Sequence, residues 1–177
     1  MLMLLEILLG LCILGALVII VYAALKPSDN TILDLSEKTP LKLESINEKE
    51  AVFSLEVPMC NIGEQDAAIT DVFARPYLPQ EQFPEAVCYG HVETTDRRRN
   101  DNYFEALILN AGQKRMLIVT LRYVAACNKP MKEILQNMVD MDVAIYINGV
   151  GRKALYVKKE FFTVFATDVK TLVGGAE

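Results

Sequence analysis

The first strong pattern in the chain is an uninterrupted apolar run from Ile7 to Leu25, with the sequence ILLGLCILGALVIIVYAAL. A helix of this length rises about 1.5 Å per residue, so it is roughly as long as the hydrocarbon core of a bilayer is thick. A buried helix of a soluble protein would carry a polar face, and this run has none. The sequence therefore predicts a transmembrane helix, and we expect residues 1–26 to form a membrane anchor.

The charges that flank the apolar run bear on its type and its direction. No lysine or arginine precedes it, whereas Lys26, Lys38 and Lys42 follow it. A cleaved signal peptide usually begins with a basic segment, so we interpret the run as an uncleaved, single-pass anchor. The positive-inside rule favours the cytoplasm for the rest of the chain. Because large domains cross membranes regardless of charge, the extracytoplasmic side stays open.

Beyond the anchor, the hydrophobic pattern changes to a period of two. Residues 27–50 read as a polar linker followed by two short edge strands, TILDL and LKLESI, which are separated by Pro40. From Ala51 to Met59, apolar and polar residues alternate, as in a strand with one buried face. Further strands are expected over residues 67–75, 86–94, 103–109, 114–125, 141–147 and 154–165.

Turn residues connect these strands. Asn61-Ile62-Gly63 separates the first two long strands, and Asn110-Ala111-Gly112 predicts a hairpin between 103–109 and 114–125. Asn148 to Gly151 predicts a tight reversal. One short helix should begin near Asn128, which would cap it, and its apolar stripe would consist of Met131, Ile134, Leu135, Met138 and Val139.

This order of elements predicts a mainly β fold. We expect an N-terminal transmembrane helix followed by an antiparallel Ig-like β-sandwich over residues 51–168, with one short helix and a flexible tail over residues 169–177.

One segment carries a resemblance to known Ig-like domains. The stretch VFSLEVPMCNIGEQDAAITDVFA reads as strand, Asn-x-Gly turn and strand. It resembles the B–C hairpin of Ig-like domains of the bacterial adhesion and late-embryogenesis-abundant (LEA-2) types. The resemblance implies the fold only, and it transfers no catalytic residue.

The N-terminus resembles a second family. The stretch LMLLEILLGLCILG, with Glu6 and Gly15, is similar to the start of mature type IV pilin-like proteins and their archaeal relatives. In that family the glutamate pairs with the N-terminal amine of the neighbouring subunit inside a filament, which would make Glu6 a partner contact. The sequence departs from the family because the basic leader before the glutamate is missing and because the helix should stop at Pro27.

The overall charge excludes some classes of partner. The net charge is −5, from 18 basic and 23 acidic residues. Nucleic-acid binding is not expected, since no basic face dominates. The sharpest basic cluster is Arg97, Arg98 and Arg99, between Asp96 and Asp101. It reads either as a solvated loop tip or as a docking loop for an acidic partner or a lipid headgroup.

Candidate chemistry is sparse. The only histidine, His91, lies three residues after Cys88, so the two should face opposite sides of a strand. With Cys60 and Cys127 they would form a Cys3His zinc set, but the paired Cys-x2-Cys spacing is missing. A Cys60–Cys88 disulfide stays open.

The carboxylates Asp140 and Asp142, on either side of Met141, read as an acid–base pair or as a solvated strand edge. The sequence contains no phosphate-binding loop, dinucleotide fingerprint or HExxH motif. We therefore expect no enzymatic activity, no catalytic residue, no cofactor and no metal.

These observations favour a non-enzymatic accessory or scaffold protein. We expect a single-pass anchor whose sandwich binds or positions a partner in a membrane complex. Its partners would be membrane lipid and another membrane protein or complex, and self-association stays open. The alternative is a pilin-like or archaellin-like filament subunit, or a filament-associated subunit.

Overall fold

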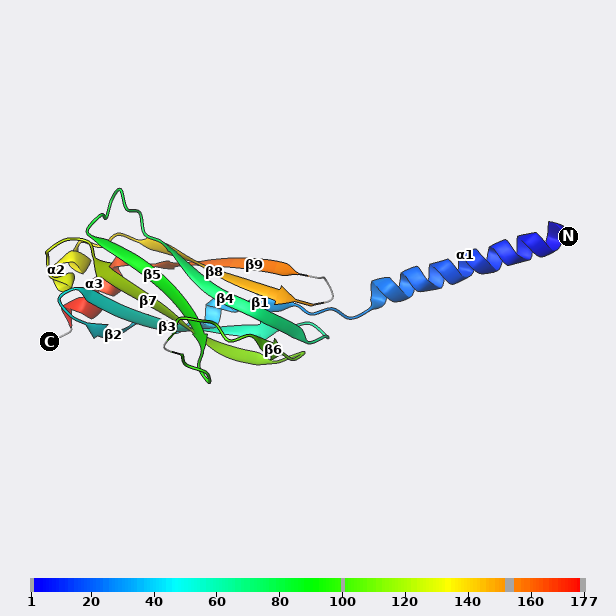
Figure 1. Cartoon of the computed structure of the whole chain (residues 1–177), viewed down its shortest axis with the longest axis horizontal. Helices are drawn as coiled ribbons and strands as arrows, with labels where there is room; N and C mark the ends of the chain where they lie inside the picture. The colour runs from blue at the N-terminus through cyan, green and yellow to red at the C-terminus, as the bar shows by residue number, and fades with distance from the viewer. Residues whose placement is uncertain (1, 100, 152–154, 176–177) are drawn as a thin grey trace.

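The computed structural model shows an N-terminal helix followed by a β-sandwich, with the helix projecting from one end of the sandwich (Figure 1). The structure describes residues 2–99, 101–151 and 155–175. Helix α1 (Leu2–Leu25) ends two residues before Pro27, as predicted. Over Glu6–Leu25 it is long and apolar enough to cross a membrane, and none of this segment is buried against the sandwich.

The sandwich consists of two antiparallel sheets. Sheet A contains β1 (Thr31–Leu33), β2 (Lys42–Ile46), β3 (Glu50–Asn61), β5 (Ala86–Thr94) and β7 (Lys114–Ala125), in the order β1-β3-β7-β5. Strand β2 pairs with the other end of β3, and a 3-10 turn, η1 (Leu35–Glu37), lies between β1 and β2. Both predicted edge strands are confirmed.

Sheet B contains β4 (Ala67–Tyr77), β6 (Leu107–Leu109), β8 (Met141–Val150) and β9 (Tyr156–Val164), in the order β6-β4-β8-β9. Sheet A has the A-B-E-D order of an Ig constant-type domain, and β4-β8-β9 has its C-F-G order. The predicted antiparallel, mainly β fold behind an apolar helix is therefore confirmed.

The core lies between the inner faces of the two sheets. Phe53, Leu55, Val57 and Met59 of β3 are buried, which confirms the alternation seen in the sequence. Opposite them lie inward residues of β8, among them Val143, Ile145 and Ile147. Burying one such side chain contributes about 1.5–3 kcal/mol, so this layer is the main source of stability.

The predicted hairpin between residues 103–109 and 114–125 is wrong. Strand β6 is only three residues long and pairs with β4 in sheet B, whereas β7 pairs with β3 and β5 in sheet A. The turn with Gly112, at φ +71°, therefore carries the chain from one sheet to the other. A turn signal predicts a reversal of the chain, but it does not identify the neighbours of the strands that follow it.

The ends of several elements also differ from the sequence expectations. Strand β4 continues through Pro76 to Tyr77, and β8 continues through Asn148 and Gly149 to Val150, where a reversal was predicted. Helix α2 (Met131–Gln136) has Pro130 at its N-cap position and no side-chain cap, so the predicted cap by Asn128 is wrong. The expected start of the last strand, at Ala154, lies outside the described residues.

The C-terminal segment is folded where a flexible tail was predicted. Helix α3 (Ala166–Gly174) packs against α2 and buries Val169 and Val173 completely. These valines are four residues apart, so they lie on one face of the helix. The predictions of a single short helix and of a flexible tail are therefore wrong for residues 169–175. Two apolar residues are a weak sequence signal, which is why α3 was not predicted. Residues 176–177 lie outside the described part.

The segment between α1 and β1 is bound to the sandwich. The Ser28 carbonyl accepts a hydrogen bond from the Glu64 amide at 3.1 Å, and the Asn30 carbonyl accepts one from the Ile62 amide at 2.9 Å. Residues 28–30 thus extend the pairing of β1 with β3 along the 62–64 turn. A Cβ atom at Gly63 would lie 2.4 Å from the Ser28 carbonyl oxygen, so this approach requires glycine.

Candidate interaction surface

The outer face of sheet B carries a group of exposed aromatic side chains. Successive residues of a strand point to opposite faces, and the outward positions here include Phe73 and Tyr77 of β4, Tyr146 of β8, and Lys159 and Phe161 of β9. We call these five residues the aromatic face. They come from three adjacent strands, so the sheet register brings them together.

Direct ring contacts hold the aromatic face together. Phe73 lies opposite Tyr146 in the β4–β8 register, and their rings stack with centroids 4.8 Å apart and planes 8° apart. The hydroxyl groups of Tyr77 and Tyr146 are 3.0 Å apart and share a hydrogen bond. The Tyr77 and Phe161 rings are 6.2 Å apart.

The Lys159 ammonium lies among three of these rings. It is 4.3 Å from the ring centroid of Phe161, 5.1 Å from that of Tyr146 and 5.6 Å from that of Tyr77. Such positions allow cation–π attraction. The pKa of Tyr146 is lowered, mainly by its hydrogen bond with Tyr77 and secondly by the Lys159 ammonium. Tyr146 in turn raises the pKa of Lys159. The face therefore presents a positive charge that lies over aromatic rings.

Much of this surface is open to solvent. Phe161 is 50% exposed, Tyr77 42% and Phe73 39%. Exposed apolar side chains continue along the same outer face toward α1: Val157 lies opposite Asn148, and Ile108 and Val150 both pair with Ala68. Isolated exposed apolar residues are normal on a protein surface, but a contiguous group is typical of an interaction site.

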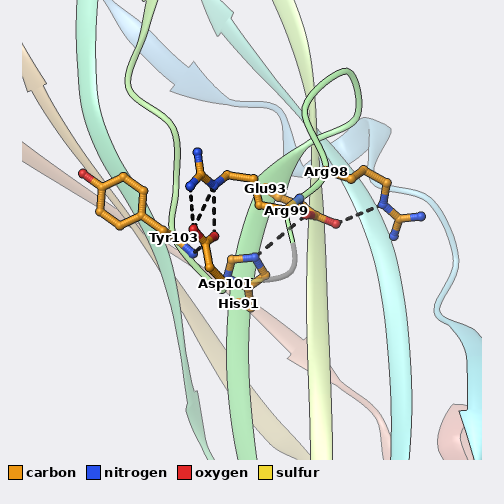
Figure 2. Close-up of polar contacts among 6 residues, drawn as sticks. All are labelled: His91, Glu93, Arg98, Arg99, Asp101 and Tyr103. Atoms are coloured by element: carbon orange, nitrogen blue, oxygen red, sulfur yellow. Dashed lines mark hydrogen bonds and ion pairs between the residues drawn. The ribbon is translucent and has the colours of Figure 1, made fainter.

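The second candidate region is the loop that carries Arg97, Arg98 and Arg99, on the outer side of sheet A. Figure 2 shows that Glu93 of β5 lies beneath it. The Glu93 side chain is only 8% exposed, and its carboxylate accepts hydrogen bonds from Arg98 Nε at 3.0 Å and from the Arg99 backbone amide at 2.9 Å. A buried carboxylate with two charge-assisted or backbone donors is well satisfied, so Glu93 holds the loop onto the sheet.

Each arginine of the loop has a carboxylate partner in the same chain. Arg97 Nη1 lies 2.6 Å from Glu105 Oε1, and Arg99 donates to Asp101 from Nε at 2.9 Å. The Arg99 guanidinium holds the pKa of Asp101 at about 2. The positive charge predicted from Arg97, Arg98 and Arg99 is therefore locally balanced. This arrangement gives the three arginines a role in loop structure, and their contact with a partner stays a prediction.

A pocket of about 340 Å³ lies beside this loop. It is lined by Val52, Tyr89, Gly90, His91, Asn102, Thr120 and Arg122. His91 Nε2 is buried without a hydrogen-bond partner and lies 4.0 Å from Glu93 Oε2. Asn102, at the rim, adopts a left-handed backbone conformation with φ 57°. The pocket places a histidine next to a carboxylate, but its lining adds no cysteine or serine nucleophile.

The structure separates the other candidate residues. The partners of Cys60 and Cys88 on β7 are Lys114 and Tyr123, nine positions apart, which corresponds to about 30 Å along the strand. A Cys60–Cys88 disulfide, left open by the sequence, is therefore excluded in this fold. All four cysteines are free, and in the described part of the chain no three His, Cys, Asp or Glu residues gather in a way that could hold a metal.

The two aspartates considered for acid–base chemistry serve as structural acceptors. Asp140 Oδ1 accepts the Ala166 amide at 2.7 Å, at the start of α3, and Asp142 Oδ1 accepts from Thr163 Oγ1 at 2.7 Å. Glu6 is exposed at the beginning of the apolar segment of α1, far from both regions. The structure thus brings Asp140 and Asp142 into contacts between elements, and it brings neither of them to the His91 pocket.

Sequence reasoning missed the aromatic face. A signal was present, since Phe73 and Tyr77 occupy outward positions of a strand where polar residues are usual. Their contacts with Tyr146, Lys159 and Phe161 depend on the register of three strands that are distant in sequence, and no local pattern encodes that register.

Comparison with known proteins gives only distant structural similarity. No protein-family model matches the sequence, and no curated protein matches it. Similar solved structures include a protein described as ApaA from Bordetella pertussis, with 10% identity, a TM-score of 0.42, and coverage of 77% of this chain and 94% of that one. Another is the GAE domain of GGA2p from Saccharomyces cerevisiae, with 9% identity, a TM-score of 0.35, and coverage of 77% and 96%.

A third similar structure is a protein from Archaeoglobus fulgidus, with 7% identity, a TM-score of 0.37, and coverage of 75% of this chain and 98% of that one. At these identities and scores the similarities carry no argument about function, and the adhesion or LEA-2 type of domain stays a prediction.

Proposed function

We propose that the protein is a single-pass, membrane-anchored, non-enzymatic accessory or scaffold protein. Its sandwich binds and positions another membrane protein or complex, and the aromatic face is the contact surface. The observation that carries this proposal is a group of aromatic rings that pack against one another, Phe73, Tyr77, Tyr146 and Phe161. Phe73, Tyr77 and Phe161 remain 39–50% exposed.

The energetics favour contact with a protein partner. Covering the exposed half of Phe161 would contribute about 2.5 kcal/mol, from a buried area of about 100 Å² at 25 cal/mol per Å². Tyrosine and phenylalanine are enriched at protein interfaces, where a few aromatic anchors provide most of the binding energy. Because the rings are already fixed by stacking and a hydrogen bond, binding costs little additional side-chain entropy.

Charge indicates the chemistry of the partner. The face carries the Lys159 ammonium, and Arg75 is an outward neighbour on β4. A complementary surface would therefore combine apolar side chains with a carboxylate. With α1 as the anchor, the positive-inside rule favours a partner surface on the cytoplasmic side.

The test is site-specific photo-crosslinking in native membranes. A photoreactive phenylalanine analogue at Phe161 should yield a discrete adduct with another membrane protein. The same analogue at Tyr89, an exposed tyrosine on the outer face of sheet A, is the matched control and should not yield that adduct. The double variant Phe73→Ser/Tyr146→Ser should abolish co-purification of the crosslinked protein.

Two results would contradict the proposal. One is equal crosslinking from the Phe161 and Tyr89 positions. The other is a monomeric, partner-free particle after mild detergent extraction of the wild-type protein.

A further inference from the structure

A second surface lies at the end of the sandwich nearest α1. The turn between β3 and β4, the end of β6 and the start of β9 all lie at this end (Figure 1). It exposes Leu155 by 66%, Ile108 by 63% and Ile62 by 60%. Three large aliphatic side chains from three separate segments are thus open to solvent on one end of the domain.

The length of the connecting chain fixes the distance of this end from α1. The apolar segment of α1 ends at Leu25, and Ser28 is already hydrogen-bonded to the Glu64 amide. Three residues span at most about 11 Å, even when fully extended. The headgroup layer beyond the hydrocarbon core is about 5–8 Å thick on each side. The connection is therefore short enough for the 62–64 turn to lie in that layer.

The attachment at this end is reinforced by side chains. Asn61 Oδ1 accepts the Asn30 backbone amide at 3.1 Å, and Lys158 Nζ donates to Asn30 Oδ1 at 2.8 Å and to the Thr31 carbonyl at 2.6 Å. The segment from Ser28 to Thr31 is thus bound to both sheets, since Asn61 belongs to β3 and Lys158 to β9. These bonds keep this end of the sandwich close to the end of α1.

We propose that this end of the sandwich rests in the headgroup layer, with Ile62, Ile108 and Leu155 in contact with lipid. The inference builds on the proposed function in one respect, because it requires α1 to span the bilayer. Aliphatic side chains at this depth gain burial from the acyl boundary, and the continuous chain from the anchor removes the cost of bringing the domain to the surface. The lipid contact is confined to one end, so the aromatic face stays available for a protein.

The chain has no tryptophan, so the fluorescence of a single introduced tryptophan reports the depth of that position in the bilayer. We would reconstitute the full chain in phosphatidylcholine vesicles, with and without dibrominated phosphatidylcholine, and measure the fluorescence of three variants. Tyr22→Trp tests insertion of α1, and Ile62→Trp tests the proposed contact. Phe165→Trp is the matched control, because Phe165 is 52% exposed and follows the far end of β9, about 30 Å away.

The expected result is loss of fluorescence with brominated lipid for Tyr22→Trp and Ile62→Trp, and none for Phe165→Trp. Quenching of Tyr22→Trp without quenching of Ile62→Trp would overturn the lipid contact while leaving the anchor intact. Absence of quenching in Tyr22→Trp would overturn both the lipid contact and the anchored function. Equal quenching of Ile62→Trp and Phe165→Trp would overturn the contact, since tryptophan itself would then be the cause.

Discussion

The buried side chain of Asn61 accepts the backbone amide of Asn30 at 3.1 Å and so connects the segment after α1 to the sandwich. Its Nδ2 group donates to the carbonyls of Gln65, at 2.8 Å, and Leu109, at 3.0 Å. One amide side chain therefore joins the N-terminal segment, the β3–β4 turn and the end of β6. Sequence reasoning recognised Asn61 only as part of a turn.

Asn61→Ala should destabilise the domain by about 1–3 kcal/mol, because it leaves several buried backbone groups without a partner. Chemical denaturation of the detergent-solubilised full chain measures this loss. Asn128→Ala is the control: Asn128 is exposed, and we expect a change within about 0.5 kcal/mol. Equal stability of the two variants would contradict the assigned role of Asn61.

Arg99→Gln should raise the pKa of Asp101 from about 2 toward its usual value of 3.8. The sign follows from the ion pair: the folded-state pKa is lowered, so the contribution to stability is present above pH 3.8 and is lost as the pH falls through about 2. Carboxyl-carbon NMR titration of Asp101 measures the shift. Lys129→Gln, which removes an ion pair at Glu85 on another loop, should leave the Asp101 titration unchanged.

The thiols should react in a defined order. Removal from water raises the pKa of the Cys88 thiol to about 12, and burial also raises the pKa of Cys60. Since the thiolate is the reactive form, alkylation near pH 8 should modify exposed Cys127 first and Cys88 last. Peptide mapping by mass spectrometry reads the order. Faster modification of Cys88 than of Cys127 would show that β5 opens from the sheet.

Lys159→Met should raise the pKa of Tyr146 toward 10, because the ammonium helps to hold it below that value. NMR titration with labelled tyrosine ring carbons detects the change. The neighbouring Lys158 donates to the Asn30–Thr31 segment instead, so Lys158→Met should leave Tyr146 unchanged. An identical Tyr146 titration in wild type and Lys159→Met would show that Lys159 does not occupy the aromatic face in solution.

Gly63→Ala should release the segment after α1 from the β3–β4 turn, because the added Cβ would lie 2.4 Å from the Ser28 carbonyl oxygen. Hydrogen exchange at the Ile62 and Glu64 amides should accelerate in this variant. Gly174→Ala is the matched control, since the nearest atom to its Cβ would be 3.9 Å away. Unchanged exchange at Ile62 and Glu64 would show that the segment tolerates the methyl group.

The sequence predicted those parts of the fold that produce a local pattern of apolar and polar residues. Burial of one face imposes a period of two, and on this pattern Lys114–Ala125 was predicted with the ends that β7 has. The ends predicted for Ala86–Thr94 are also those of β5. The pairing of β6 with β4 was not predictable, because three residues carry no period and the choice of neighbour depends on the whole sheet. The aromatic face depended on register in the same way. Glu93, which holds the arginine loop onto sheet A, resembles any solvated strand carboxylate until its partners are known.

The short connection at Lys26 and Pro27 links the rotation of the domain to that of the helix. Proline has a fixed φ, and the residues after it are paired with a turn, so few backbone torsions remain between α1 and the sheets. A protein that binds one side of α1 within the lipid would thereby fix the direction in which the aromatic face points around the membrane normal. Binding to α1 and binding to the aromatic face would then be linked. The first contact raises the effective concentration of the partner at the second.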